Sequence, residues 1–419
     1  MASIWINLRT GAWLTAIRIR GYSIIVLAIA VSAILGWIAT SSSMIDLNKK
    51  PIGTDFSSFY AAGSLALEGK AAAAYDIAAH HARQEKNFGN ATPHYVWLYP
   101  PPFLLIATPL ALLPYAAALA LWQGLTLVLY LVAIGAIVKR SGIVLSPRDW
   151  ILPALAFPAV LINLGHGQNG FLTASLFAAA LLNLPIRPIV AGVLFGLLSY
   201  KPQFALMIPL ALLAARQWKT MTAATVTVLA LILLTVVMFG PDTWHAFFAS
   251  TTTARELLLE QGSVGFEKLQ SAFAALRSWE AEIPLAYACQ TAVTVLVGAA
   301  IVWLWRGPHD YALKAGALLV GTLLASPHVL DYDLVLLGPA LTFLSLYMMK
   351  TGIRDFEATA LAGCWIAPLI ARTVADLTDI PLGLMAMTLA FEIVIWRAVT
   401  NTATHSRAGV MVRAGSNTS

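Results

Sequence analysis

Charged side chains are scarce in this sequence. Asp, Glu, Lys and Arg make up 11% of the 419 residues, whereas 59% of the residues are hydrophobic. A soluble domain carries about 25% charged residues, so this shortage excludes an ordinary soluble protein and places the chain in a lipid bilayer. The apolar runs are continuous rather than alternating, which argues against a β-barrel and predicts an all-α polytopic membrane protein.

Other features are missing as well. The two cysteines, Cys289 and Cys364, lie inside apolar segments without metal-ligand spacing, so neither a disulfide framework nor a cysteine-based metal site is indicated. No basic run with interleaved aromatic residues is present, which argues against nucleic acid as a partner. The net charge of +6 is better explained by Lys and Arg in cytoplasmic loops. We also find no internal repeat of the kind that marks many transporters.

Hydropathy and the positions of Lys and Arg predict one membrane domain over residues 1–419, with roughly twelve spans and both termini in the cytoplasm. The first span, 22–40, follows three arginines and is interpreted as an uncleaved anchor. The later spans are expected at 115–138, 150–164, 170–184, 188–200, 202–215, 221–239, 284–305, 311–326, 334–349, 357–372 and 382–397. Re-entrant segments between 150 and 215 are the alternative and would change the number of spans.

The polar parts of the chain fall mainly outside the membrane in this topology. Segment 41–114 is an external loop with juxtamembrane helices, among them a short, proline-bounded one at 100–114, and segment 241–283 is also external. Within the first loop, 75–90 reads as an amphipathic helix with a solvated face that includes His80 and His81. Residues 398–419, with Arg407 and Arg413, form a basic and flexible cytoplasmic tail that begins at about Arg397.

Asp55, in "TDFSSFYAAG", is the first candidate for chemistry. One interpretation is a helix cap, since Asp is a favoured N-cap and a helix beginning at Phe56 would lie on the membrane through Phe56, Phe59 and Tyr60. The other interpretation is a general base at the boundary of water and lipid, where an apolar surface tends to raise the pKa of a carboxyl group. The two roles are compatible in one residue.

Two further motifs offer neutral polar groups on the same side. "NLGHGQNG" (163–170) places Asn163, His166, Gln168 and Asn169 between two apolar helices, either as a plain connecting loop or as ligands for sugar hydroxyls. "HYVWLYPPPF" (94–103), which contains Tyr99, is either an aromatic belt at the interface or a platform for a sugar or lipid tail.

Charged groups come from two other places. Lys201 interrupts an apolar stretch, and it either snorkels to lipid headgroups or binds a phosphate. "SPHVLDYDLVL" (326–336) brings His328, Asp331 and Asp333 to an external helix start, as a capped turn, as anion ligands or as metal ligands, although the spacing matches no strong metal motif.

Together these pieces resemble the membrane glycosyltransferases of the GT-C class, above all the polyprenol-phosphate-mannose-dependent α-mannosyltransferases. The resemblance covers roughly residues 20 to 350 and rests on the order of "DFSSFYAAGSLALEGKAAAAYD", "YPPPFLLIATPLALLP", "GHGQNGFLTASLFAAALLN", "AGVLFGLLSYKPQFALMIPLALLAARQWK" and "SPHVLDYDLVL". It implies a multi-helix GT-C bundle, a lipid-phosphate sugar donor and an active site on the outer face. Many GT-C enzymes carry two adjacent acids in the first loop, whereas this motif has Asp55 alone.

The resemblance also assigns roles to residues. Asp55 is expected to be the catalytic base, and Lys201 and His328 are expected to bind the donor phosphate. Binding of the sugar or the acceptor is expected of a larger set, namely Tyr60, Tyr99, His166, Gln168, Asn169, Asp331 and Asp333. The acceptor is a hydroxyl of a lipid or glycan, the sugar is mannose by default, and inversion is expected for a single displacement. No metal and no cofactor are expected, because the lipid phosphate is already a good leaving group.

Two other functions are also consistent with these motifs. A flippase or transporter for a lipid-linked sugar would use the same amphipathic loop and cations without a base. A polymerase or ligase for lipid-linked glycans would share the GT-C bundle, but usually has a larger external domain. For all three, the expected location is the inner (plasma) membrane, with the site facing the exterior or periplasm.

Overall fold

The computed structural model describes residues 2–415 and the side chains of residues 3–400. Within these residues all named elements are helices, and extended pairing is limited to three isolated β-bridges. Seven helical segments are long and apolar enough to cross a membrane, namely α2 (Ala16–Ala39), α6 (Tyr115–Ser141), α12 (Trp218–Phe239), α15 (Ile283–Arg306), η7 with α17 (Asp331–Thr351), α18 (Glu357–Thr378) and the Leu382–Thr400 part of α19 (Leu382–Gly415). The predicted all-α membrane fold is therefore confirmed.

The remaining predicted spans correspond to shorter or broken helices. The helices α7 (Pro147–Leu155) and α8 (Pro158–His166) pass the same test only as a pair bent by 50°. The bend falls at Pro158, which lacks the backbone N–H that would continue the helix. Shorter apolar helices are α9 (Gly170–Asn183), α10 (Pro188–Leu197), α11 (Met207–Ala214) and α16 (Tyr311–Leu324). By length, seven or eight segments can span, and the number twelve stays a prediction.

Small residues let the short helices pack closely. Gly192 and Gly196 lie one turn apart on α10 and face α12. A Cβ atom on Gly192 would lie 2.3 Å from the carbonyl oxygen of Thr220, so only glycine permits this approach of the two backbones.

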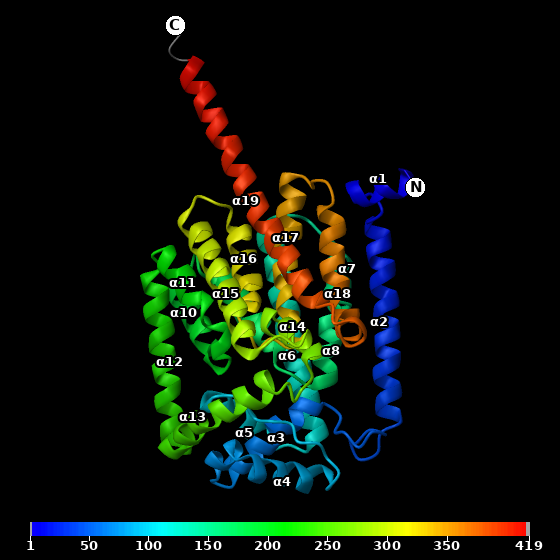
Figure 1. Cartoon of the computed structure of the whole chain (residues 1–419), viewed down its shortest axis with the longest axis vertical. Coiled ribbons are helices and arrows are strands. Elements are labelled where there is room, and N and C mark those ends of the chain that lie inside the picture. The colour runs from blue at the N-terminus through cyan, green and yellow to red at the C-terminus, as the bar shows by residue number, and fades with distance from the viewer. Residues whose placement is uncertain (1, 416–419) are drawn as a thin grey trace.

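The two predicted external segments form a layer at one end of the bundle. The first contains α3 (Thr54–Leu67), η1 (Ala71–Tyr75), α4 (Ile77–Phe88), η2 (Pro101–Phe103) and α5 (Leu104–Leu110). The second contains α13 (Pro241–Arg255), η5 (Glu256–Glu260), η6 (Phe266–Lys268) and α14 (Ala272–Ser278). Figure 1 shows α3, α4, α5 and α13 together, at the end opposite α1 (Ala2–Thr10) and the last turns of α19.

Helix α3 is covered by protein, contrary to the prediction that it lies on the membrane. Phe56 and Phe59 are buried, with exposed fractions of 0% and 2%, and contact other aromatic rings. Tyr60 is partly buried, and its hydroxyl donates a hydrogen bond to the carbonyl of Leu113. The helical spacing of these aromatic residues was recognised correctly, but α4 and α5 cover the face that we expected to meet lipid.

One charged position, Arg397, also differs from the sequence prediction. Arg397 is buried rather than at the surface of the tail, and it forms an ion pair with Glu357 that joins α19 to α18. A buried arginine needs such a partner because an unpaired charge inside protein is costly. The predicted tail, 398–419, is helical to Gly415, whereas residues 416–419 and the side chains of Arg407 and Arg413 lie outside the described residues.

The contact between α3 and α5 depends on Gly63, and a substitution there tests it. A Cβ atom at Gly63 would lie 2.1 Å from the carbonyl oxygen of Ala107. We expect Gly63→Ala to lower the free energy of unfolding by about 1–3 kcal/mol, because α3 must move away from α5. Gly124→Ala on α6 is the matched control, since it meets no atom within 4 Å and should be neutral or slightly stabilising. Equal thermal stability of the two variants, followed by tryptophan fluorescence, would contradict the close contact.

Candidate active site

Asp55 lies in the first turn of α3, and it does not cap the helix. The helix begins at Thr54, two residues before the predicted start, and its N-cap is Gly53 in a left-handed conformation with φ of +73°. An acidic residue in the first turn is stabilised by the helix dipole. The Asp55 side chain is 23% exposed, so its carboxylate is held by protein and still reachable.

Both carboxylate oxygens of Asp55 face the loop after α8. The amide Nε2 of Gln168 donates to Oδ2 at 3.0 Å, and Nδ1 of His166 lies 3.8 Å from Oδ1. The hydroxyl of Thr54 lies between the Asp55 carboxylate and the His166 ring, 3.4 Å from Oδ1 and 2.8 Å from Nδ1. The structure therefore brings Asp55, His166 and Gln168 together, as the sequence suggested.

A second set of bonds fixes the orientation of Gln168. Its Oε1 accepts hydrogen bonds from the Tyr99 hydroxyl at 3.0 Å and from the Asn169 backbone N–H at 2.8 Å. Its backbone carbonyl accepts from the amides of Gln123 and Asn163, both at 3.1 Å. Because Oε1 already has two donors, the amide of Gln168 must present its N–H group to Asp55.

Asn169 is left with spare hydrogen-bonding capacity. Its side chain is fully buried, and among the described residues neither amide atom makes a hydrogen bond. Buried polar atoms are rarely left in this state. Neither atom has accessible surface, and the Tyr99 hydroxyl lies close to this amide, so Asn169 forms part of the enclosed wall behind the Asp55 site.

The pKa of Asp55 is lower than that of an ordinary carboxyl group, which corrects the raised value expected at an apolar surface. Burial raises the pKa, but the nearby His166 ring, the hydrogen bond from Gln168 and the charge of Lys268 together outweigh it. Asp55 is therefore ionised at neutral pH and able to accept a proton.

Lys201 and Asp333 are brought together in the interior. The ammonium Nζ of Lys201 lies 2.5 Å from Oδ1 of Asp333, and each side chain is only 2% exposed. The Asp333 Oδ2 atom accepts from the Leu330 backbone N–H, and the Lys201 ammonium also lies over the Tyr332 ring. Much of the Lys201 charge is thus compensated within the protein, and its predicted role in phosphate binding stays a prediction.

The other residues of "SPHVLDYD" lie around this pair. Burial lowers the pKa of His328, the Asp333 carboxylate opposes that effect and the Lys201 ammonium adds to it, so the imidazole is neutral. Asp331 is buried and accepts a hydrogen bond from the Tyr332 backbone N–H. The Tyr332 ring lies 5.7 Å from the His166 ring and so connects this turn with the Asp55 cluster. In the part of the chain that the structure describes, no three His, Cys, Asp or Glu side chains form a metal-binding group.

Tyr60 stands apart from the other predicted site residues. Its ring packs on Phe56 and Tyr115, and its hydroxyl is engaged by the Leu113 carbonyl. The structure shows no contact between Tyr60 and Asp55, so sugar binding by Tyr60 remains a prediction.

Two cations near Asp55 and Asp331, Lys268 and Arg372, were not among the predicted site residues. Lys268 is half-buried on η6. Burial lowers its pKa and repulsion from Arg372 lowers it further, whereas the carboxylates of Glu267, Asp331 and Asp55 oppose this. Among the described residues, neither cation has a carboxylate oxygen within ion-pair distance. Arg372 was recognisable, because it lies at the outer end of a predicted span, where arginine is disfavoured by the positive-inside rule.

Backbone pairing explains how Lys268 reaches this place. Leu269 and Leu330 form an isolated β-bridge, and the N–H of Gln270 donates to the carbonyl of Val329 at 2.7 Å. The second external segment is thereby fixed beside the turn that carries Asp331.

Much of the sequence that forms this site matches a known protein family. Residues 97–327, more than half of the chain, match the sequence model of Glycosyltransferase family 87. The chain belongs to this family, and it is therefore a transferase that moves a sugar. No curated protein and no solved structure match the chain. The matched range includes Tyr99, "GHGQNG", Lys201 and Lys268, while Asp55 precedes it and His328 follows it.

The buried pair of Lys201 and Asp333 yields a stability prediction. Lys201→Met should lower the free energy of unfolding by about 3–5 kcal/mol, because it leaves the Asp333 carboxylate buried and unpaired. The double variant Lys201→Met, Asp333→Leu should recover most of this loss, since no buried charge remains.

An exposed ion pair supplies the control for this experiment. Arg9 and Asp355 are 56% and 55% exposed, and Arg9→Met should cost at most about 1 kcal/mol. Thermal unfolding of the purified variants measures both effects. A Lys201→Met variant as stable as Arg9→Met would contradict the buried pair.

Proposed function

We propose that this member of glycosyltransferase family 87 is an inverting GT-C enzyme. It transfers a sugar, mannose by expectation, from a polyprenyl phosphate to a hydroxyl group of a lipid or glycan acceptor. Family membership supports sugar transfer in general. The lipid-phosphate donor, the identity of the sugar and the outer-face location are parts of the proposal that rest on the resemblance and on the site geometry.

The observation that carries the proposal is the state of Asp55. Its carboxylate is ionised, oriented by Gln168 and His166, and partly exposed. A general base needs this combination of a free lone pair, a fixed direction and access for the reacting hydroxyl.

The reaction then follows from the charges. The acceptor oxygen forms a bond to the anomeric carbon while the bond from that carbon to the phosphate oxygen breaks, and the electron pair leaves on the phosphate. The hydroxyl proton passes to Asp55. A carboxylate with a low pKa is a weak base, which suits proton transfer late in the displacement, when the attacking oxygen has become acidic.

The leaving phosphate requires positive charge, and Lys268 with Arg372 fits this need. Two cations that repel each other without a carboxylate partner favour an anion between them. Lys268 is coupled electrostatically to Asp55, and both cations are coupled to Asp331, which supports their placement at the border of the same site. Lys201 is a weaker candidate because Asp333 already neutralises it, and His328 is neutral.

The polar groups fit the sugar. His166 is 25% exposed beside Asp55 and is a group that a sugar hydroxyl can reach, while the enclosed amides of Gln168 and Asn169 form the wall behind it. An imidazole nitrogen can donate or accept, and a hydroxyl group does both.

The expected orientation places this site outside. The basic residues that end the predicted spans, Lys139, Arg140, Arg216, Lys219, Lys350 and Arg354, belong to the opposite ends of those helices from the external layer. The positive-inside rule then assigns the end with α1 to the cytoplasm and the layer with α3 to the exterior or periplasm (Figure 1).

Replacement of Asp55 tests the base directly. We expect Asp55→Asn to lower transfer by at least about 100-fold, because the amide cannot accept the proton, while expression and thermal stability are kept. Transfer of radiolabelled sugar from polyprenyl phosphate in membranes is the assay. Asp242→Asn, at a 92% exposed carboxylate in the second external segment, is the control and should be fully active. Full activity of Asp55→Asn would refute the assignment.

The phosphate ligands have a separate test. We expect Lys268→Gln to weaken binding of farnesyl phosphate, a short analogue of the lipid phosphate, by about tenfold or more, because a charge-assisted hydrogen bond contributes about 1.5–3 kcal/mol. Lys86→Gln, at an exposed lysine on α4, should bind as the wild type does. Unchanged binding of farnesyl phosphate by Lys268→Gln would show that Lys268 does not bind the phosphate.

A further inference from the structure

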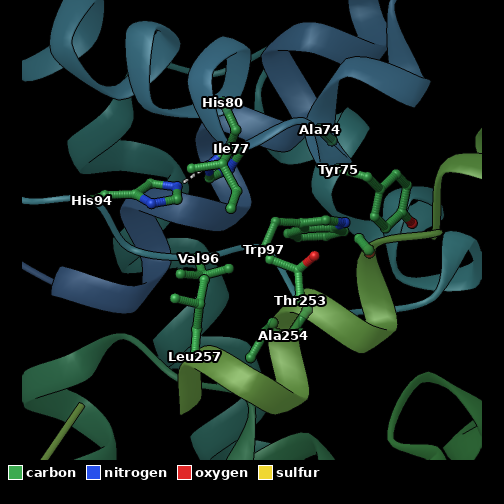
Figure 2. A pocket seen from close by; sticks show the side chains of 12 residues that line it. Ala74, Tyr75, Ile77, His80, His94, Val96, Trp97, Thr253, Ala254 and Leu257 are labelled. Carbon is green, nitrogen blue, oxygen red and sulfur yellow. Dashed lines mark hydrogen bonds between the residues drawn. The ribbon is translucent and has the colours of Figure 1, made fainter. Parts of the chain in front are cut away.

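A second recess lies in the external layer, apart from Asp55. It is formed by η1, the start of α4, the segment 94–98, the last turns of α13 and the start of η5, and its cavity volume is about 70 Å³. Figure 2 shows its side chains, with the Trp97 ring across the middle and Thr253 beside it. A recess of this size cannot enclose a whole ligand, so it offers a contact surface for one part of a larger molecule.

The lining of this recess is polar and aromatic on one part and aliphatic on the other. The polar and aromatic groups are Tyr75, His80, His94, Trp97, Ser250 and Thr253, and the remaining side chains are Ala, Ile, Val and Leu. None of them is a carboxylate, a lysine or an arginine. Aromatic faces with hydroxyl and imidazole groups suit a sugar ring, which has an apolar face and a rim of hydroxyl groups.

The two histidines carry no charge either. Burial lowers the pKa of His80 to about 3 and the pKa of His94 to about 4, so both are neutral at physiological pH. The predicted solvated position of His80 is thus wrong, because its ring is buried against the carbonyl of Ser58. A recess without formal charge disfavours a phosphate and favours a neutral ligand.

Hydrogen-bonding capacity in the recess remains unused. Neutral His80 donates from Nε2 to the Ser58 carbonyl, so its Nδ1 accepts from Nε2 of His94 at 3.4 Å (Figure 2), which leaves Nδ1 of His94 as an acceptor. The buried indole N–H of Trp97 lies beside the Tyr75 hydroxyl, so the polar groups that a ligand can reach are those of His94, Ser250 and Thr253. An isoprenoid chain would leave these groups unpaired, whereas sugar hydroxyls can pair with them.

The recess and the active site share a wall. The Tyr75 hydroxyl donates to the Tyr99 carbonyl at 2.9 Å, and the Trp97 ring lies 5.3 Å from the Tyr99 ring. The Tyr99 hydroxyl in turn holds Gln168, which orients Asp55. A ligand in the recess thus lies one aromatic layer from the catalytic groups.

We propose that this recess is an acceptor subsite that binds a neutral carbohydrate unit of a glycan acceptor against Trp97 and Thr253. The inference rests on the proposed function, because it takes the acceptor to be a glycan. It identifies the part of the acceptor that is recognised, namely an uncharged sugar unit held away from the reacting hydroxyl.

A cysteine-protection experiment tests the subsite locally. Thr253 is exposed at the recess, and Thr252 is exposed on the same helix without lining it. With the native cysteines replaced, Thr253→Cys and Thr252→Cys are labelled with a maleimide in lipid nanodiscs, because glycoside detergents would compete. Mannobiose at about ten times its Kd should slow labelling of Thr253→Cys about tenfold, since only the free fraction reacts, and should not affect Thr252→Cys.

Two other probes decide between occupants. Mannose 6-phosphate should protect less than mannobiose, because the recess offers no cation. If farnesyl phosphate protects Thr253→Cys and mannobiose does not, the recess is a groove for the lipid tail and the sugar subsite is refuted. Equal labelling with and without mannobiose would overturn the proposal.

A larger side chain at position 253, which would occupy the recess, tests whether the subsite contributes to sugar transfer. Thr253→Trp should raise the KM for a glycan acceptor with little change in kcat or in the KM for the donor, whereas Thr252→Trp should behave as the wild type. The proposed function is judged separately by Asp55→Asn. An inactive Asp55→Asn with an unaffected Thr253→Trp would refute the subsite and leave the transferase mechanism standing.

Discussion

The side-chain amide of Gln168 fixes the direction in which Asp55 can act. An amide has one acceptor end and one donor end, and the Tyr99 hydroxyl with the Asn169 backbone N–H occupies the acceptor end. The donor end must then face a carboxylate oxygen. Since Gln123 and Asn163 hold the backbone of the same residue, the loop cannot turn to another arrangement without losing several buried hydrogen bonds. The Asp55 carboxylate is therefore oriented by helices α6 and α8 as much as by its own helix.

Charge is divided unevenly around this centre. On one side, Lys201 and Asp333 form a buried ion pair, which connects the segment after α10 to the turn before α17. On the other side, Lys268 acts on Asp55 and Asp331 at longer range and Arg372 acts on Asp331, and neither cation has a partner at ion-pair distance among the described residues. A closed pair stabilises the scaffold, whereas an open set of charges is available to a ligand. This difference in burial and pairing separates Lys201 from the two proposed phosphate ligands, and residue type alone does not.

The sequence predicted the helices well because lipid imposes a simple rule on composition. Each expected span has a helix at its place, and "GHGQNG" does lie against Asp55. It predicted less well which face each helix buries. Phe56 and Phe59 have the spacing of a membrane-facing helix, but a second protein layer covers them, and one-dimensional periodicity cannot distinguish lipid from protein as the apolar neighbour. Arg397 was misplaced for a similar reason, since its partner Glu357 is forty residues away in the chain. The lowered pKa of Asp55 likewise depends on partners from distant segments.

The short pairing of Leu269 with Leu330 has a mechanical consequence. It joins the second external segment to the acidic turn through backbone atoms, in a protein whose other described contacts are almost all between helices. Lys268 and Asp331 each adjoin this bridge, one on either side of it. Because backbone atoms make the connection, these two charged residues stay near each other whichever side chains occupy positions 269 and 330.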